Sequence, residues 1–195
     1  MRVNSIWLAI ATTLTFSSAA LADKSTAPGQ NKLLCFDGTS DGGFGGACTV
    51  TSGAKSKQVG TLTTNGGHPN GEYAGVYFEK GPLDGKYLGQ VANLAFSYAG
   101  SPAGAGAPRF SVPIDFDNNG TWDLFAFISA FYCNDGAGRV DVINDATCTI
   151  FIGSESFPNW AAFAAAHPTW RIAKDAVTFI ISDEPGQWTI SNVKY

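Results

Sequence analysis

Methionine, histidine and charged side chains are scarce in this sequence. The 195 residues include one Met and two His, and only 14% of them are charged. Lys and Arg number 12 against 16 Asp and Glu, and the basic residues form no cluster of the kind that binds a phosphate backbone. The composition therefore argues against nucleic acid as a partner.

Long apolar runs are missing as well. A membrane-spanning helix needs about 20 apolar residues, and the one apolar run, from residue 6 to about residue 16, is too short. Arg2 before this run and the small residues 17–22 after it are typical of a secretory signal peptide that is cleaved after Ala22. We therefore expect a secreted or periplasmic protein with no transmembrane segment.

The cleavage divides the chain into three parts: a signal peptide at 1–22, a flexible polar lead-in at 23–33 and a single domain at 34–195. Removal of the signal peptide leaves 173 residues with 11 basic and 16 acidic side chains, a net charge of −5. A chain of this length buries about 70% of its unfolded surface, which is enough for one core.

An even number of cysteines in an exported chain indicates disulfide bonds. The four residues are Cys35, Cys48, Cys133 and Cys148. The spacing favours local pairing, the first with the second and the third with the fourth, although other connectivities stay open. The alternative is a zinc site, but neither pair has zinc-ligand spacing, and His68 and His167 are distant in sequence.

Short apolar segments alternate with clusters of Gly, Pro, Asn and Asp, which is the pattern of an all-β protein. Residues 109–115 and 176–182 alternate in polarity and predict half-buried strands. Pro113 cannot donate to a strand ladder, so we place the first of these strands at a sheet edge or a bulge. Residues 122–132 are apolar at nearly every position, which predicts a central strand covered on both faces.

One segment departs from the strand pattern. Residues 158–167 are rich in Ala, with Pro near the start and another Pro just past the end, and they predict a short helix. Trp160, Phe163 and His167 fall on one stripe of this helix, which we expect to pack on a sheet.

The sequence from Asp115 to Asp123 has the spacing of a calcium-binding loop. Oxygen-bearing side chains stand at relative positions 1, 3, 5 and 9, with Gly at position 6 for the turn. The predicted ligands are Asp115, Asp117, Asn119, Asp123 and the carbonyl of Thr121. Position 12 is Ala126 instead of the bidentate Glu of an EF-hand, so a strict EF-hand is excluded. A simple hairpin with an Asn-Gly turn is the alternative.

These residues resemble the calcium loops of FG-GAP repeats, whose D-x-D-x-D-G-x-x-D-L pattern matches positions 115–124. The resemblance covers ten residues and occurs once, so it implies only the loop and not a propeller. Asn119 in place of a third acid weakens the implied calcium site. Asn119-Gly120-Thr121 is also an N-glycosylation sequon.

Exposed aromatic residues are the candidates for ligand binding. In the predicted strand 72–79, Tyr73, Gly75 and Tyr77 share one face, and two tyrosines flanking a glycine can form a platform for a sugar ring. Trp122 is a further candidate. The alternative is that these aromatic rings belong to the core.

The exported part loosely resembles secreted β-sandwich modules of the jelly-roll or carbohydrate-binding type. The likeness rests on residues 107–112, the 157–168 segment and the C-terminal stretch 188–193. It implies an antiparallel β-sandwich, but fold likeness alone does not identify a ligand.

The leading hypothesis is therefore an exported, calcium-stabilised, non-catalytic protein that binds a polysaccharide or a cell-surface glycan. A structural or adhesive envelope protein is the second hypothesis. A small glycan-cleaving enzyme is the third, since such an enzyme needs two suitably spaced carboxylates and Glu72, Glu79, Glu155, Asp183 and Glu184 are available.

Overall fold

The computed structural model describes residues 32–38, 45–52, 58–65, 72–78, 83–104, 106–133 and 138–195. The predicted signal peptide lies outside these residues, as do His68, Glu79 and the lead-in except for its last two residues, of which Leu33 already belongs to strand β1.

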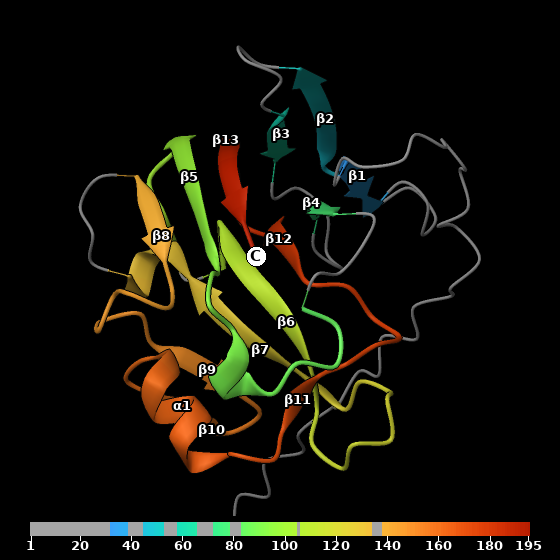
Figure 1. Ribbon diagram of the computed structural model, residues 1–195. Coiled ribbons are helices and arrows are strands. Elements are labelled where there is room, and N and C mark those ends of the chain that lie inside the picture. Colours follow the sequence, from blue (N-terminus) through green and yellow to red (C-terminus); the bar gives the residue numbers. More distant parts are fainter. Residues whose placement is uncertain are drawn as a thin grey trace, which may run out of the picture.

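Two antiparallel sheets make up the fold (Figure 1), which confirms the predicted all-β, sandwich-like class. The larger sheet has the order β1-β4-β12-β6-β7-β9-β10, and β11 pairs with β6. Its strands are β1 (Leu33–Asp37), β4 (Ala74–Phe78), β12 (Phe179–Ser182), β6 (Arg109–Asp115), β7 (Leu124–Ser129), β9 (Ile150–Ile152), β10 (Glu155–Phe157) and β11 (Arg171–Ile172).

The smaller sheet has the order β2-β3-β13-β5-β8. Its strands are β2 (Ala47–Ser52), β3 (Gln58–Thr64), β13 (Gly186–Lys194), β5 (Ala95–Gly100) and β8 (Arg139–Asp141). Two short 3-10 helices lie in the connections between strands: η4 (Leu88–Gln90) precedes β5, and η5 (Ala130–Tyr132) follows β7. Among the described residues, no helix is long and apolar enough to cross a membrane.

The core lies between the two sheets. The rings of Phe96 in β5 and Phe110 in β6 meet edge to face, with their centroids 4.9 Å apart. A Cβ on Gly60 in β3 would lie 2.6 Å from Cγ1 of Val76 in β4, so the backbone of one sheet approaches the side chains of the other at this point. Burial also raises the pKa of the Tyr195 phenol, whose hydroxyl donates to the carbonyl of Thr178.

The sequence placed Pro113 at a sheet edge or a bulge, but β6 is an inner strand and its register with β7 runs through Pro113 without a shift, so this prediction is wrong. Strand β6 pairs with β7 on one side and with β12 and β11 on the other. The partner on that second side is interrupted: β12 pairs with residues 109–111 and β11 with residues 114–115, and Pro113 falls between them. The missing N–H is tolerated there because no ladder hydrogen bond is required of it.

The prediction that residues 122–132 are covered on both faces is also wrong. Ala126 and Ile128 are fully buried against the core, whereas Phe127 on the opposite face is 38% exposed and Phe131 is 59% exposed. A continuous apolar run does not by itself reveal whether a second layer covers the outer face.

The predicted helix is confirmed as α1 (Trp160–Ala166). The side chain of Asn159 caps its start by accepting a hydrogen bond from the backbone N–H of Ala162. Trp160 and Phe163 are buried on the expected stripe, and the Trp160 indole donates to the carbonyl of Leu88 in η4.

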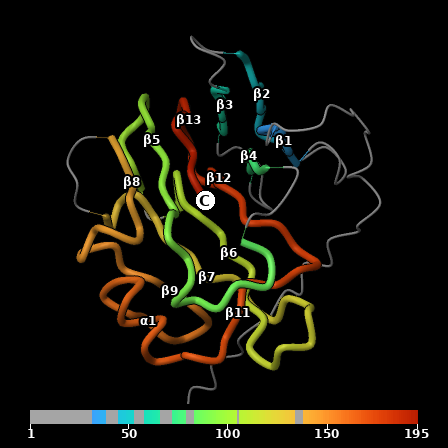
Figure 2. Tube along the Cα trace, viewed as in Figure 1, coloured from blue at the N-terminus to red at the C-terminus, as the bar shows by residue number. Residues whose placement is uncertain are grey.

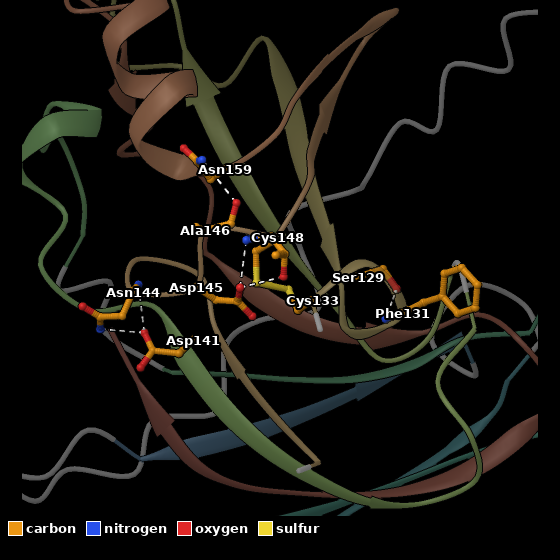
Figure 3. The surroundings of a disulfide bond; sticks show 10 residues. Ser129, Phe131, Cys133, Asp141, Asn144, Asp145, Ala146, Cys148 and Asn159 are labelled. Carbon is orange, nitrogen blue, oxygen red and sulfur yellow. Dashed lines mark hydrogen bonds between the residues drawn. A yellow bond between two sulfur atoms is a disulfide. The ribbon is translucent and has the colours of Figure 1, made fainter. Parts of the chain in front are cut away.

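Both disulfides pair as the spacing predicted. Cys35 in β1 bonds Cys48 in β2 and thereby joins the edges of the two sheets. Cys133 bonds Cys148 and ties the end of η5 to the start of β9. Figure 3 shows the second disulfide beside the Asn159 cap, whose amide donates to the carbonyl of Ala146.

We predict that replacing Cys35 and Cys48 by Ala destabilises the domain by about 3 kcal/mol, because the unfolded chain loses a loop constraint. The melting temperature should fall by about 6–12 °C, as followed by circular dichroism. The matched control is the Cys133→Ala, Cys148→Ala variant, which removes the other disulfide, the one that does not join the two sheets. A melting temperature unchanged in the first variant would show that the bond between the sheets contributes nothing.

Candidate functional site

The loop between β6 and β7 is drawn in yellow in Figure 2. It brings three carboxylates together. Asp115 ends β6, Asp117 lies in the loop and Asp123 precedes β7, and one ligand atom from each lies within 4.8 Å of the others. Asp115 is only 2% exposed. All three are oxygen donors, so this cluster can hold a hard divalent cation.

Backbone N–H groups hold the carboxylates in place. Asp115 accepts from the N–H groups of Asn119 and Gly120, at 3.2 and 2.8 Å, and Asp123 accepts from the N–H of Phe116 at 2.9 Å. A carboxylate has about four acceptor sites, so these bonds leave lone pairs for a cation.

The other two predicted ligands are differently engaged. The amide oxygen of Asn119 accepts from both the N–H and the hydroxyl of Thr121, and the Asn119 amide group donates to Asp117. The Asn119 side chain is therefore engaged within the loop, whereas the three aspartates converge; the predicted carbonyl ligand of Thr121 stays a prediction. The predicted hairpin does form between β6 and β7, but its loop spans residues 116–123, with positive φ at Asn118 and Gly120, instead of a tight Asn-Gly turn.

Residues 174–175 fasten this loop to the rest of the domain. The N–H of Trp122 donates to Asp175 at 2.8 Å, and the N–H of Lys174 donates to the carbonyl of Gly120 at 3.1 Å. The loop thus fixes Trp122 at the border of the larger sheet, where its indole packs on Phe125 with a centroid distance of 4.9 Å.

The space between the two candidate tyrosines is filled by Phe36. A Cβ on Gly75 would lie 2.2 Å from the tip of the Phe36 ring, so this ring lies directly over the glycine. Its centroid is 6.2 Å from the ring of Tyr73 and 6.1 Å from that of Tyr77, which is 9% exposed. Phe36 therefore occupies the space over Gly75 that the sequence predicted to be open for a sugar ring, and Tyr77 is buried.

These rings belong to a larger set on the outer face of the larger sheet, which we call the aromatic strip. Its members are linked by ring contacts, from Phe36 through Phe179 at 5.3 Å, to Phe125 at 5.4 Å. The Phe125 ring also contacts the rings of Trp122 and Phe127, with centroid distances of 4.9 and 6.4 Å. The strip consists of Phe36, Tyr77, Phe179, Phe125, Phe127 and Trp122.

Strand register explains why these rings share a face. Tyr77 is directly opposite Phe179, Phe179 is opposite Ser111, Ser111 is opposite Phe127, and Phe127 is opposite Phe151. Directly opposed residues of antiparallel strands point to the same side. The row therefore crosses the sheet at right angles to its strands, from β4 to β9.

Ser111 lies at the centre of this row and is fully buried between the flanking phenylalanines. Its hydroxyl has no hydrogen-bond partner among the described residues. A buried hydroxyl without a partner is costly, so its presence on this face needs a reason other than stability.

Arg109 is a charged residue that borders the strip at Phe127. Its guanidinium lies over the Phe127 ring, 5.0 Å from the centroid, pairs with Asp183 at 2.5 Å, and donates to the carbonyl of Gly106. The positive charge is therefore neutralised by a neighbour. Its side chain is only 15% exposed.

Three of the carboxylates considered for hydrolysis interact with other groups of the protein. Glu72 accepts from the N–H of Asn65, and Glu184 accepts from the N–H of Gly106. Glu155 lies 3.9 Å from the imidazole of His167, which stacks on Trp170 at a centroid distance of 3.5 Å.

Comparison with known proteins finds no match, since no protein-family model, curated protein or solved structure is significantly similar to this chain.

The sequence alone did not identify Phe36, Phe125, Phe127 and Phe179 as surface residues of one site. Each of the four points to the outer face of its strand. They come from three different strands, β1, β7 and β12, and only the order in which the strands pair brings them together. Phe125, Phe127 and Phe179 belong to segments that the sequence predicted as strands, whereas no strand was predicted around Phe36, and the strand order was the missing information.

We predict that Ser111→Ala stabilises the domain by about 1 kcal/mol, because it removes a buried hydroxyl without a partner. Ser129→Ala is the matched control on the next strand and should destabilise by a similar amount, since the Ser129 hydroxyl donates to Gly104 and accepts from the N–H of Phe131. Urea unfolding measures both. Equal destabilisation by the two substitutions would contradict the assignment of Ser111 as unpartnered.

Proposed function

We propose that the protein is an exported, non-catalytic β-sandwich that binds carbohydrate through the outer face of its larger sheet and is stabilised by calcium. The observation that carries the proposal is the aromatic strip. Of the predicted ligand-binding residues, Trp122 and Tyr77 belong to the strip and Tyr73 lies beside it. Exposed aromatic rings offer flat apolar faces on which the apolar face of a pyranose can stack. The exposed members of the strip are Phe127 and Trp122, at 38% and 37%, whereas Tyr77 is buried, and exposed apolar side chains that lie together on one face can mark an interaction site.

Export is supported by the disulfides. Cys35–Cys48 and Cys133–Cys148 leave no free cysteine among the described residues. Structural disulfides persist in oxidising compartments. Together with the signal-peptide pattern at 1–22, they favour a secreted or periplasmic protein.

Calcium is supported by the donor set of the loop. Three aspartate carboxylates converge within 4.8 Å, and one of them, Asp115, is almost fully buried. Calcium requires six to eight oxygen ligands, so backbone carbonyls or water would complete the shell. Holding three like charges together is unfavourable without a counterion, and a divalent cation would relieve this repulsion.

We predict that EDTA lowers the melting temperature of the wild-type protein and that Asp117→Ala removes this effect. At a calcium concentration one hundred times the dissociation constant, the expected shift is about 5–10 °C. Asp145→Ala is the matched control, because Asp145 caps a turn by accepting from Thr147 and lies outside the cluster. Identical melting curves with and without chelator would contradict the calcium proposal.

For carbohydrate binding, we predict that the protein is retained on an insoluble polysaccharide and that Trp122→Ala weakens this binding about two- to tenfold. Phe116→Ala is the matched control, since Phe116 is exposed on the same loop but packs on Trp170, outside the strip. Pull-down and isothermal titration measure the change. Absence of binding to every polysaccharide would reject the carbohydrate proposal, and self-association of the protein would then favour the adhesive alternative.

A further inference from the structure

The two disulfides differ in their access to solvent, and from this difference we infer that Cys35–Cys48 is a site of thiol–disulfide exchange, at which a small thiol forms a mixed disulfide with the protein. The exchange opens the covalent link between the two sheets and leaves Cys133–Cys148 intact. This reactivity is independent of the proposed binding of carbohydrate and calcium.

The Cys35–Cys48 bond borders an open groove between β1 and β2, which lie side by side in Figure 1. The groove has a volume of about 500 Å³ and is lined by residues 32–35, 48–52 and 58. Cys35 and Cys48 are half-buried, whereas Cys133 is 5% exposed and Cys148 is fully buried. Sites for small molecules have volumes of this order, so a small thiol can enter the groove and reach the first bond, while the second is enclosed in the core.

Strands β1 and β2 are the terminal strands of their sheets. β1 pairs with β4 and β2 pairs with β3, and in the described part of the chain neither has a neighbouring strand on its other side. Breaking the disulfide therefore interrupts no strand ladder. The fold persists because β1 keeps its pairing with β4, and because the side chain of Gln58 in β3 accepts from the N–H of Leu33 at 2.6 Å.

The charges near the two disulfides also differ. The attacking species in an exchange is a thiolate, which is an anion. Among the residues that line the groove, Lys32 alone is charged, and its positive charge attracts a thiolate. The second disulfide has the acidic residue Asp145 beside it (Figure 3), and the N–H of Cys148 donates to the Asp145 carbonyl. Attack is therefore favoured at the first disulfide and disfavoured at the second.

The sulfur of Cys35 is the more open target within the first bond. The carbonyl oxygen of Gly75 lies 3.1 Å from Sγ of Cys48 and occupies one side of that sulfur. The incoming thiolate forms a new S–S bond to Cys35, the bond between Cys35 and Cys48 breaks, and its electron pair leaves with the Cys48 sulfur, which takes a proton from water. The resulting Cys48 thiol can donate to the Gly75 carbonyl, which stabilises the opened form.

A second thiol completes the reduction. Its thiolate attacks the mixed disulfide at the sulfur of the first thiol, and Cys35 leaves and is protonated. The two small thiols are thereby oxidised to one disulfide, and the protein disulfide is reduced to two thiols.

The test treats the native protein with reduced glutathione, blocks free thiols with iodoacetamide at increasing times and maps the modified cysteines by mass spectrometry. Cys35 and Cys48 should be modified at least about tenfold faster than Cys133 and Cys148, with the glutathione adduct on Cys35. Low concentrations of urea should leave the rate at the first pair unchanged and accelerate the second, because a buried bond reacts only when the domain unfolds.

Two charge variants test the groove. Lys32→Gln should slow the exchange at Cys35 by about twofold at low ionic strength, and the difference should disappear at high salt. Lys194→Gln is the matched control, since Lys194 is the last residue of β13 and does not line the groove. Equal melting temperatures establish that both variants fold.

Three outcomes would overturn the inference or part of it. Modification of both disulfides at one rate, or a rate at Cys35 that rises with urea as steeply as that at Cys133, would show that the exchange follows unfolding of the domain. An adduct on Cys48 would contradict the assignment of Cys35 as the attacked sulfur. An equal loss of rate in Lys194→Gln would remove the role of Lys32.

Discussion

The pairing register of the larger sheet determines both faces of the molecule. Cys35 stands between Leu34 and Phe36 in β1, so its turn toward β2, where it bonds Cys48, directs Phe36 to the outside. A shift of one residue would exchange the faces, because side chains alternate along a strand. The disulfide between the sheets therefore also fixes which side of β1 contributes to the aromatic strip.

Local patterns in the sequence predicted an all-β chain with strands near 72–79, 109–115, 122–132 and 176–182, the helix and both disulfides, because each depends on residues close together in the sequence. The three aspartates of the 115–123 loop were predictable for the same reason. The aromatic strip was not, because Phe36, Phe127 and Phe179 become neighbours only through the strand order. The interrupted partner that accommodates Pro113 has the same origin, since β11 and β12 pair with β6 in succession.

The carboxylate loop and the strip meet at Trp122. Asp123 belongs to the carboxylate cluster. Its neighbour Trp122 packs its indole on Phe125. The N–H of Trp122 is held by Asp175, so the ring is positioned by the backbone of the loop and not only by its own packing. Any change in loop geometry would therefore move the end of the strip. This connects the proposed stabilisation by a cation with the proposed binding surface.

The choice of residues on the outer face is the strongest sign of a partner. A solvent-facing sheet surface normally carries polar side chains at alternate positions. Here Phe127 and Trp122 are 38% and 37% exposed, and the rings beside them shield a serine that would be better solvated in the open. Stability alone would favour replacing that buried hydroxyl and covering or removing the exposed rings. The exposed rings of Phe127 and Trp122 are therefore the observation on which the proposed binding surface rests.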